Sequence, residues 1–127
     1  MSISLQTRNT VVAIFVSAAI TVVFLLPFCG FMYKCGCTYL WAGSAETCNI
    51  HLSGVAHCPW CVRRNPVLMV LPFVVILAGQ GFSIHLLSRR YHLSLLQLLV
   101  VGIAVFLLLG ALNGYVFKVW DDYPYFF

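Results

Sequence analysis

The sequence predicts an all-α integral membrane protein with three transmembrane helices and one extramembrane loop of about 30 residues that is rich in cysteine and histidine. Hydrophobic side chains make up 62% of the 127 residues and charged side chains only 8%. A soluble domain with this composition would have too little polar surface to cover itself. Three long uncharged runs account for most of the hydrophobic residues, and nothing repeats at a fixed period, so we expect residues 1–127 to form a single membrane domain.

The three uncharged runs extend over residues 10–33, 67–88 and 93–117. Each is longer than the roughly 20 residues that a helix needs to cross about 30 Å of hydrocarbon. A core helix of a soluble protein would carry a polar stripe, whereas the polar residues in these runs are isolated. Arg8 precedes the first run as in a signal peptide, but no convincing small-x-small cleavage site follows. We therefore expect the first run to remain as a helix.

The connections between the runs differ greatly in length. The second and third runs are joined by Arg89–His92 alone, so their helices should be antiparallel neighbours, whereas residues 34–65 form the one large loop. Three Lys and Arg residues lie on the side of the N-terminus and four on the side of the loop, which determines the orientation only weakly. All the acids lie on the loop side, and the first run resembles a signal anchor. We expect a plasma or inner membrane location with an extracytoplasmic loop.

The loop contains most of the residues that could bind a metal. It offers a primary set and an auxiliary set of ligands, which are Cys48, His51, Cys58 and Cys61, and Cys35, Cys37 and His57. The primary set consists of two pairs, and the two-residue gap within each pair lets both side chains bind one ion. Three cysteines and one histidine suit tetrahedral zinc. The additional thiols also suit copper(I), so the sequence predicts an accessory protein that binds zinc or copper in a structural or metal-handling role.

Two other uses of the cysteines are open at this point. Cys58-x-x-Cys61 precedes a predicted helix, with Arg63 and Arg64 close by, and this setting favours a reactive thiolate. The pair could therefore be the catalytic site of a thiol-disulfide oxidoreductase. Alternatively, disulfides could brace the loop of a scaffold subunit in a membrane complex, which would require Cys29 to pair as the sixth cysteine.

The segment Cys58-Pro-Trp-Cys61-Val-Arg63-Arg64 resembles the quinone-coupled disulfide-forming membrane proteins of the DsbB type. Those proteins also place Cys-x-x-Cys ahead of the second span, with an arginine a few residues later. The resemblance implies redox exchange at Cys58 and Cys61. DsbB-type proteins have four spans and a second cysteine pair in another loop, whereas this chain has three predicted spans and no cysteine after Cys61.

The remaining patterns point to packing rather than catalysis. Gly110 and Gly114 form a GxxxG pattern, which predicts close helix packing, either within the chain or with a membrane-protein partner or a second copy. There is no serine-histidine-aspartate grouping and no phosphate-binding glycine loop, so a non-enzymatic role is favoured. The basic residues are scattered rather than clustered, which argues against nucleic-acid binding. The lipid bilayer is the expected surrounding.

Overall fold

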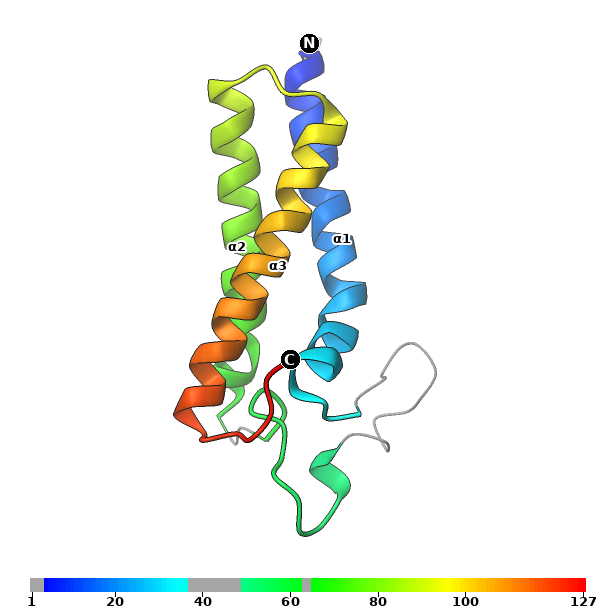
Figure 1. The fold of residues 1–127 in the computed structure, drawn as a ribbon. Helices are drawn as coiled ribbons and strands as arrows, with labels where there is room; N and C mark the ends of the chain where they lie inside the picture. The colour runs from blue at the N-terminus through cyan, green and yellow to red at the C-terminus, as the bar shows by residue number, and fades with distance from the viewer. Residues whose placement is uncertain (1–3, 37–48, 63–64) are drawn as a thin grey trace.

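The computed structural model describes residues 4–36, 49–62 and 65–127, and this part of the chain is helical. The long helices are α1 (Leu5–Tyr33), α2 (Pro66–Arg90) and α3 (Leu95–Trp120), and η2 (Asn49–His51) is a single 3-10 turn. The three long helices lie side by side in a bundle, with the start of α1 at one end and residues 49–62 and the C-terminus at the other (Figure 1). The expectation of three long apolar helices is confirmed.

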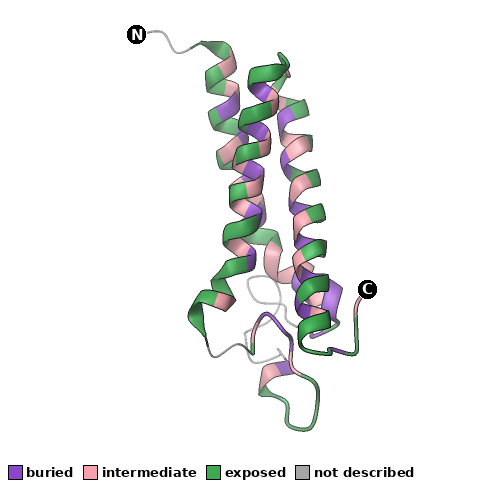
Figure 2. Cartoon of the chain, turned by 90° about the vertical axis from the view of Figure 1, so that its left-hand side faces the viewer, coloured by how far each residue is buried: buried purple, intermediate pink, exposed green. Residues whose placement is uncertain are grey.

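Each long helix is able to cross a membrane by its length and composition. The most apolar windows of α1, α2 and α3 have mean hydropathies of 2.7, 2.2 and 2.8. Large apolar side chains cover the outside of the bundle, including Phe15 and Leu108, which are 71% and 68% exposed. The exposed positions run the length of each helix, and the buried positions form narrow inner stripes (Figure 2). Such an apolar exterior is consistent with a lipid environment.

Capping groups place the helix ends a few residues from the predicted bounds. The Ser4 side chain accepts a hydrogen bond from the backbone N–H of Thr7, so α1 begins at Leu5 rather than at residue 10. Ser94 and Gln97 form a capping box, so α3 begins at Leu95 rather than at residue 93. The second and third helices end at Arg90 and Trp120, two and three residues past their predicted ends. The predicted ends had been placed at the last residue before a charged side chain, whereas the helices continue past those charges.

Polar side chains in the bundle interior tie the three helices together. Thr21 in α1 donates a hydrogen bond to Gln80 Oε1 in α2 at 2.8 Å, and Gln80 Nε2 donates to the Gly102 carbonyl in α3 at 2.9 Å. The Gln80 amide is 3% exposed, so it satisfies its donor and acceptor groups within the protein. These bonds fix the relative positions of the helices, because a shift along either axis would leave a buried amide unpaired.

The glycines of α3 allow α1 to approach closely. A Cβ atom added to Gly110 would lie 2.7 Å from the Phe28 ring, and one added to Gly114 would overlap the Met32 sulfur. Both glycines are buried, so the GxxxG pattern packs within the chain. The expectation that the same glycines bind a partner or a second copy stays a prediction.

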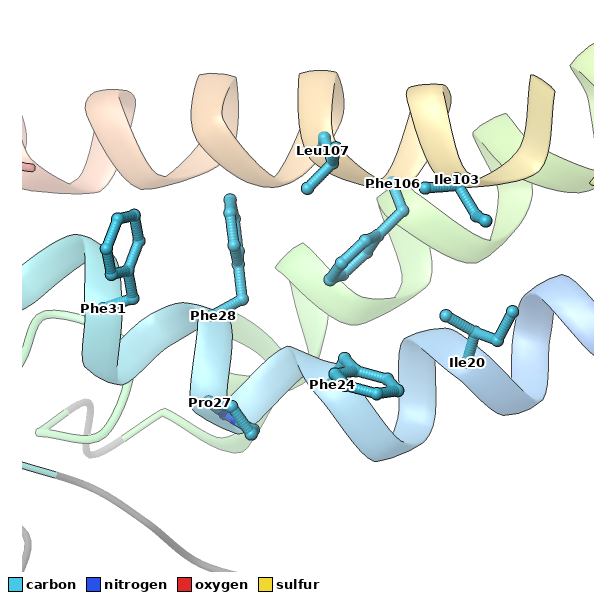
Figure 3. Close-up of a pocket in the computed structure, with 8 residues that line it drawn as sticks. All are labelled: Ile20, Phe24, Pro27, Phe28, Phe31, Ile103, Phe106 and Leu107. Atoms are coloured by element: carbon cyan, nitrogen blue, oxygen red, sulfur yellow. The ribbon is translucent and has the colours of Figure 1, made fainter. Parts of the chain in front are cut away.

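An apolar groove of about 460 Å³ opens between α1 and α3. Phe28 and Phe31 point from α1 toward α3 in this groove (Figure 3). Its lining is wholly apolar and consists of Ile20, Phe24, Pro27, Phe28, Phe31, Ile103, Phe106 and Leu107. Specific ligand sites need a few polar groups that fix orientation, and this groove provides none. The groove therefore lacks the features of a specific ligand site.

Candidate metal centre

Three cysteine sulfurs come together where the loop meets the end of α1. The Sγ atoms of Cys29, Cys58 and Cys61 all lie within 4.8 Å of one another, and those of Cys29 and Cys58 are 3.4 Å apart. Cys29 belongs to α1, four residues before its end, which is about 6 Å along the helix axis. Cys58 and Cys61 belong to the segment that leads into α2. The cluster therefore joins residues that are 29 positions apart in the chain.

The spacing of these sulfurs suits a single metal ion. Tetrahedral zinc with Zn–S bonds of about 2.3 Å places its sulfur ligands about 3.8 Å from one another. Separations up to 4.8 Å reach that geometry through small side-chain rotations. The donor set consists of sulfur alone, which favours thiophilic ions over magnesium or calcium.

Cys35 packs beside this group of three sulfurs. It is 3% exposed, and it packs with Cys29, Cys58 and the aromatic side chains around them. The hydrogen bond with Cys29 lowers the pKa of the Cys58 thiol, but those with Cys35 and Cys61, together with burial, outweigh it and hold this pKa well above its ordinary range. Without a cation the Cys58 thiol is therefore held in its neutral form. A bound cation would stabilise the thiolate form and release protons.

Asn49 connects the chain segments that carry the cysteines. Its backbone N–H donates to the Cys35 carbonyl at 3.1 Å, and its side-chain Oδ1 accepts from the Cys58 N–H at 3.0 Å. Its Nδ2 donates to the Ala56 carbonyl at 2.8 Å and to the Tyr123 hydroxyl at 3.1 Å. One buried amide therefore holds two cysteine segments and the C-terminal tail in a fixed arrangement.

The turn at Cys58 is closed by its own backbone. The N–H groups of Cys61 and Val62 both donate to the Cys58 carbonyl, at 3.0 and 3.1 Å. This turn directs both thiols of the Cys58-x-x-Cys61 pair toward Cys29. This agrees with the expectation that a two-residue gap lets both side chains of the pair approach one ion.

Aromatic side chains from three parts of the chain enclose the thiols. Tyr33 packs edge-on against Trp60 and Tyr123, with ring centroids 5.6 and 5.5 Å apart. Tyr33 donates a hydrogen bond to the Gly114 carbonyl at 2.8 Å, and Tyr123 donates to the Tyr33 carbonyl at 3.1 Å. The C-terminal tail thus folds back over the end of α1 and shields the cluster. The buried indole N–H of Trp60 has no hydrogen-bond partner.

The predicted ligands have different positions in the structure. Cys58 and Cys61 lie in the cluster, and Cys35 packs beside it, whereas Cys37 and Cys48 lie outside the described residues. His51 is exposed, and His57 Nε2 donates to the Leu52 carbonyl at 2.9 Å. Among the residues that the structure describes, neither histidine belongs to a group of potential metal ligands. The pairing of Cys48 with His51 at one ion stays a prediction.

Cys29 was not among the predicted ligands. In the sequence it falls within the first uncharged run, before Lys34, and it was expected only as a possible disulfide partner. The available signal was its distance from the end of the span, since a residue one turn inside a helix can still face the loop that follows. None of the described cysteines, which are Cys29, Cys35, Cys58 and Cys61, forms a disulfide.

Comparison with known proteins gives no relative from which a role could be transferred: no family model, no curated protein and no solved structure matches the chain.

Proposed function

We propose that this is an integral membrane protein that binds one thiophilic metal ion, zinc or copper(I), through Cys29, Cys58 and Cys61. The observation that carries the proposal is the approach of three sulfurs to within 4.8 Å in a shielded position. Bound metal would connect the end of α1 to the segment before α2. The role would be accessory, either stabilising the loop or holding the metal for another membrane component.

Charge favours zinc over copper(I) if all three thiolates bind. Three thiolates and a divalent ion carry a net charge of about −1, whereas three thiolates and a monovalent ion carry about −2. Burial penalises each excess charge, and Cys29 and Cys58 are both fully buried. Trp60, whose buried indole N–H has no hydrogen-bond partner, belongs to the same hydrophobic cluster as Cys29 and Cys58.

Metal analysis of the protein purified in mild detergent tests this proposal. We expect about one equivalent of zinc or copper, and thiols that become titratable only after chelation. Cys29→Ser should lose the metal, whereas His51→Ala should keep it. The reverse result would favour the ligand pair Cys48 and His51 instead. A wild-type protein with no metal and no protected thiols would reject metal binding.

A second candidate function is thiol-disulfide exchange at Cys58 and Cys61. The supporting observation is that Cys29 Sγ lies 3.4 Å from Cys58 Sγ, which provides a third thiol within reach of the pair. Oxidation of two thiols to a disulfide releases two protons and two electrons, so this activity requires an electron acceptor. Isolation of an oxidised, metal-free protein would favour it. Full retention of metal by reduced protein would favour the metal site.

A further inference from the structure

A cavity lies beside the thiol cluster, with Cys35 in its lining. Its volume is about 550 Å³, which is in the range of small-molecule sites, and its lining is part polar and part apolar. The walls come from the segment after α1, from the loop around η2 and from the C-terminal tail, and include Lys34, Cys35, Asn49, Ala56 and Tyr125. This cavity differs from the groove between α1 and α3, which has no polar lining.

Cys35 lies between this cavity and the buried thiols. It is one of the residues that line the cavity, whereas Cys29, Cys58 and Cys61 are not. On its other side it interacts with Cys58 and packs in the same hydrophobic cluster as Cys29. Cys29 and Cys58 are only 1% and 0% exposed, whereas Cys61 is partly exposed but does not line the cavity. A metal ion that approaches from this cavity would therefore meet Cys35 before it reaches either of them.

We infer that Cys35 is the transfer ligand of the centre: it accepts a metal ion from a small anionic thiol complex in the cavity and passes it to Cys29, Cys58 and Cys61. This inference rests on the proposed metal site. The Lys34 ammonium at the cavity supplies the positive charge that an anionic carrier requires. In the exchange, the bond between the metal and the carrier sulfur breaks as the bond to Cys35 forms. The Cys35 proton passes to the released carrier sulfur. As the metal then moves on, Cys29, Cys58 and Cys61 each lose a proton on binding it, and these protons pass to Cys35 and to the remaining carrier sulfurs as they leave the metal; the oxidation state of the metal does not change.

A transfer ligand and a permanent ligand differ in their effect on exchange kinetics. Loss of a permanent ligand weakens binding and speeds release. Loss of a transfer ligand slows uptake and release together, so the affinity changes little. In Cys35→Ser we expect full metal content and exchange with a zinc–thiol complex slowed by about tenfold or more, which corresponds to a barrier higher by about 1.4 kcal/mol. Loss of metal or faster release in this variant would overturn the inference.

Filling the cavity provides an independent test that leaves every thiol in place. Ala56→Trp adds a bulky side chain at a residue that lines the cavity and should slow exchange while the metal content is unchanged. Ser53→Trp is the matched control, because Ser53 is exposed in the same loop and does not line the cavity. Normal exchange in Ala56→Trp would overturn this inference alone, whereas absence of metal from the wild-type protein would overturn the proposed function with it.

Alkylation of the metal-free protein tests the route if Ala56→Trp fails to fold. Iodoacetate and iodoacetamide have similar size but differ in charge, and mass spectrometry reports their reaction at Cys35. We expect Lys34→Gln to slow iodoacetate several-fold and to leave iodoacetamide unchanged, because only the first reagent is anionic. Lys118→Gln is the control, since Lys118 does not line the cavity. If iodoacetate reacts with Cys35 as fast in Lys34→Gln as in the wild type, the anionic carrier is rejected.

Discussion

Asn49 provides the sharpest test of how the loop positions its thiols. Its side chain makes three hydrogen bonds, to Ala56, Tyr123 and Cys58, and it is 8% exposed. Each bond contributes about 1 kcal/mol net, so Asn49→Ala removes about 3 kcal/mol. If half of this loss appears in metal binding the affinity falls about tenfold, and if all of it appears the affinity falls about 100-fold. Outer-shell residues of metal sites have effects of this size.

The assay is competition against a chromogenic zinc chelator at fixed pH in detergent. Ser53→Ala is the control, because Ser53 is an exposed residue of the same loop and should bind zinc as the wild type does. Helix content measured by circular dichroism should be unchanged in both variants, since the three long helices do not depend on Asn49. An affinity of Asn49→Ala within twofold of the control would refute the positioning role.

Three further predictions concern the bundle and its orientation. Gln80→Leu should lower the free energy of unfolding in detergent by about 1 kcal/mol, because it removes the bonds to α1 and α3, whereas Asn113→Leu should not, since Asn113 bonds only within its own helix. Gly114→Leu should cost about 1–3 kcal/mol because the new side chain displaces Met32, and Gly81→Leu is the control, with no atom near its Cβ position. Both are read by denaturant unfolding. Finally, a reporter enzyme fused to the N-terminus should be active in the cytoplasm, and activity on the opposite side would reverse the predicted orientation.

The sequence by itself determined the three long helices and identified two of the three clustered cysteines, Cys58 and Cys61. Uncharged runs longer than a membrane span leave few alternatives to helices, since every backbone group must be satisfied internally. Local spacing also identified the Cys58-x-x-Cys61 turn, because two residues between the thiols bring them to one side whatever surrounds them. These features depend on contacts between residues that are near one another in the chain.

Only the tertiary structure decided that Cys29 joins this pair and that Asn49 and Tyr123 hold the arrangement together. Cys29 and Cys58 are separated by 29 positions, and Asn49 and Tyr123 by 74. No local pattern encodes such contacts, because they depend on how the loop returns to the end of α1 and how the tail folds over it. From the sequence alone, a residue of an apolar run that faces the interior of the bundle therefore cannot be told from one that faces outward. What separates them is the packing of distant segments, which fixes the inward face of α1 at Cys29.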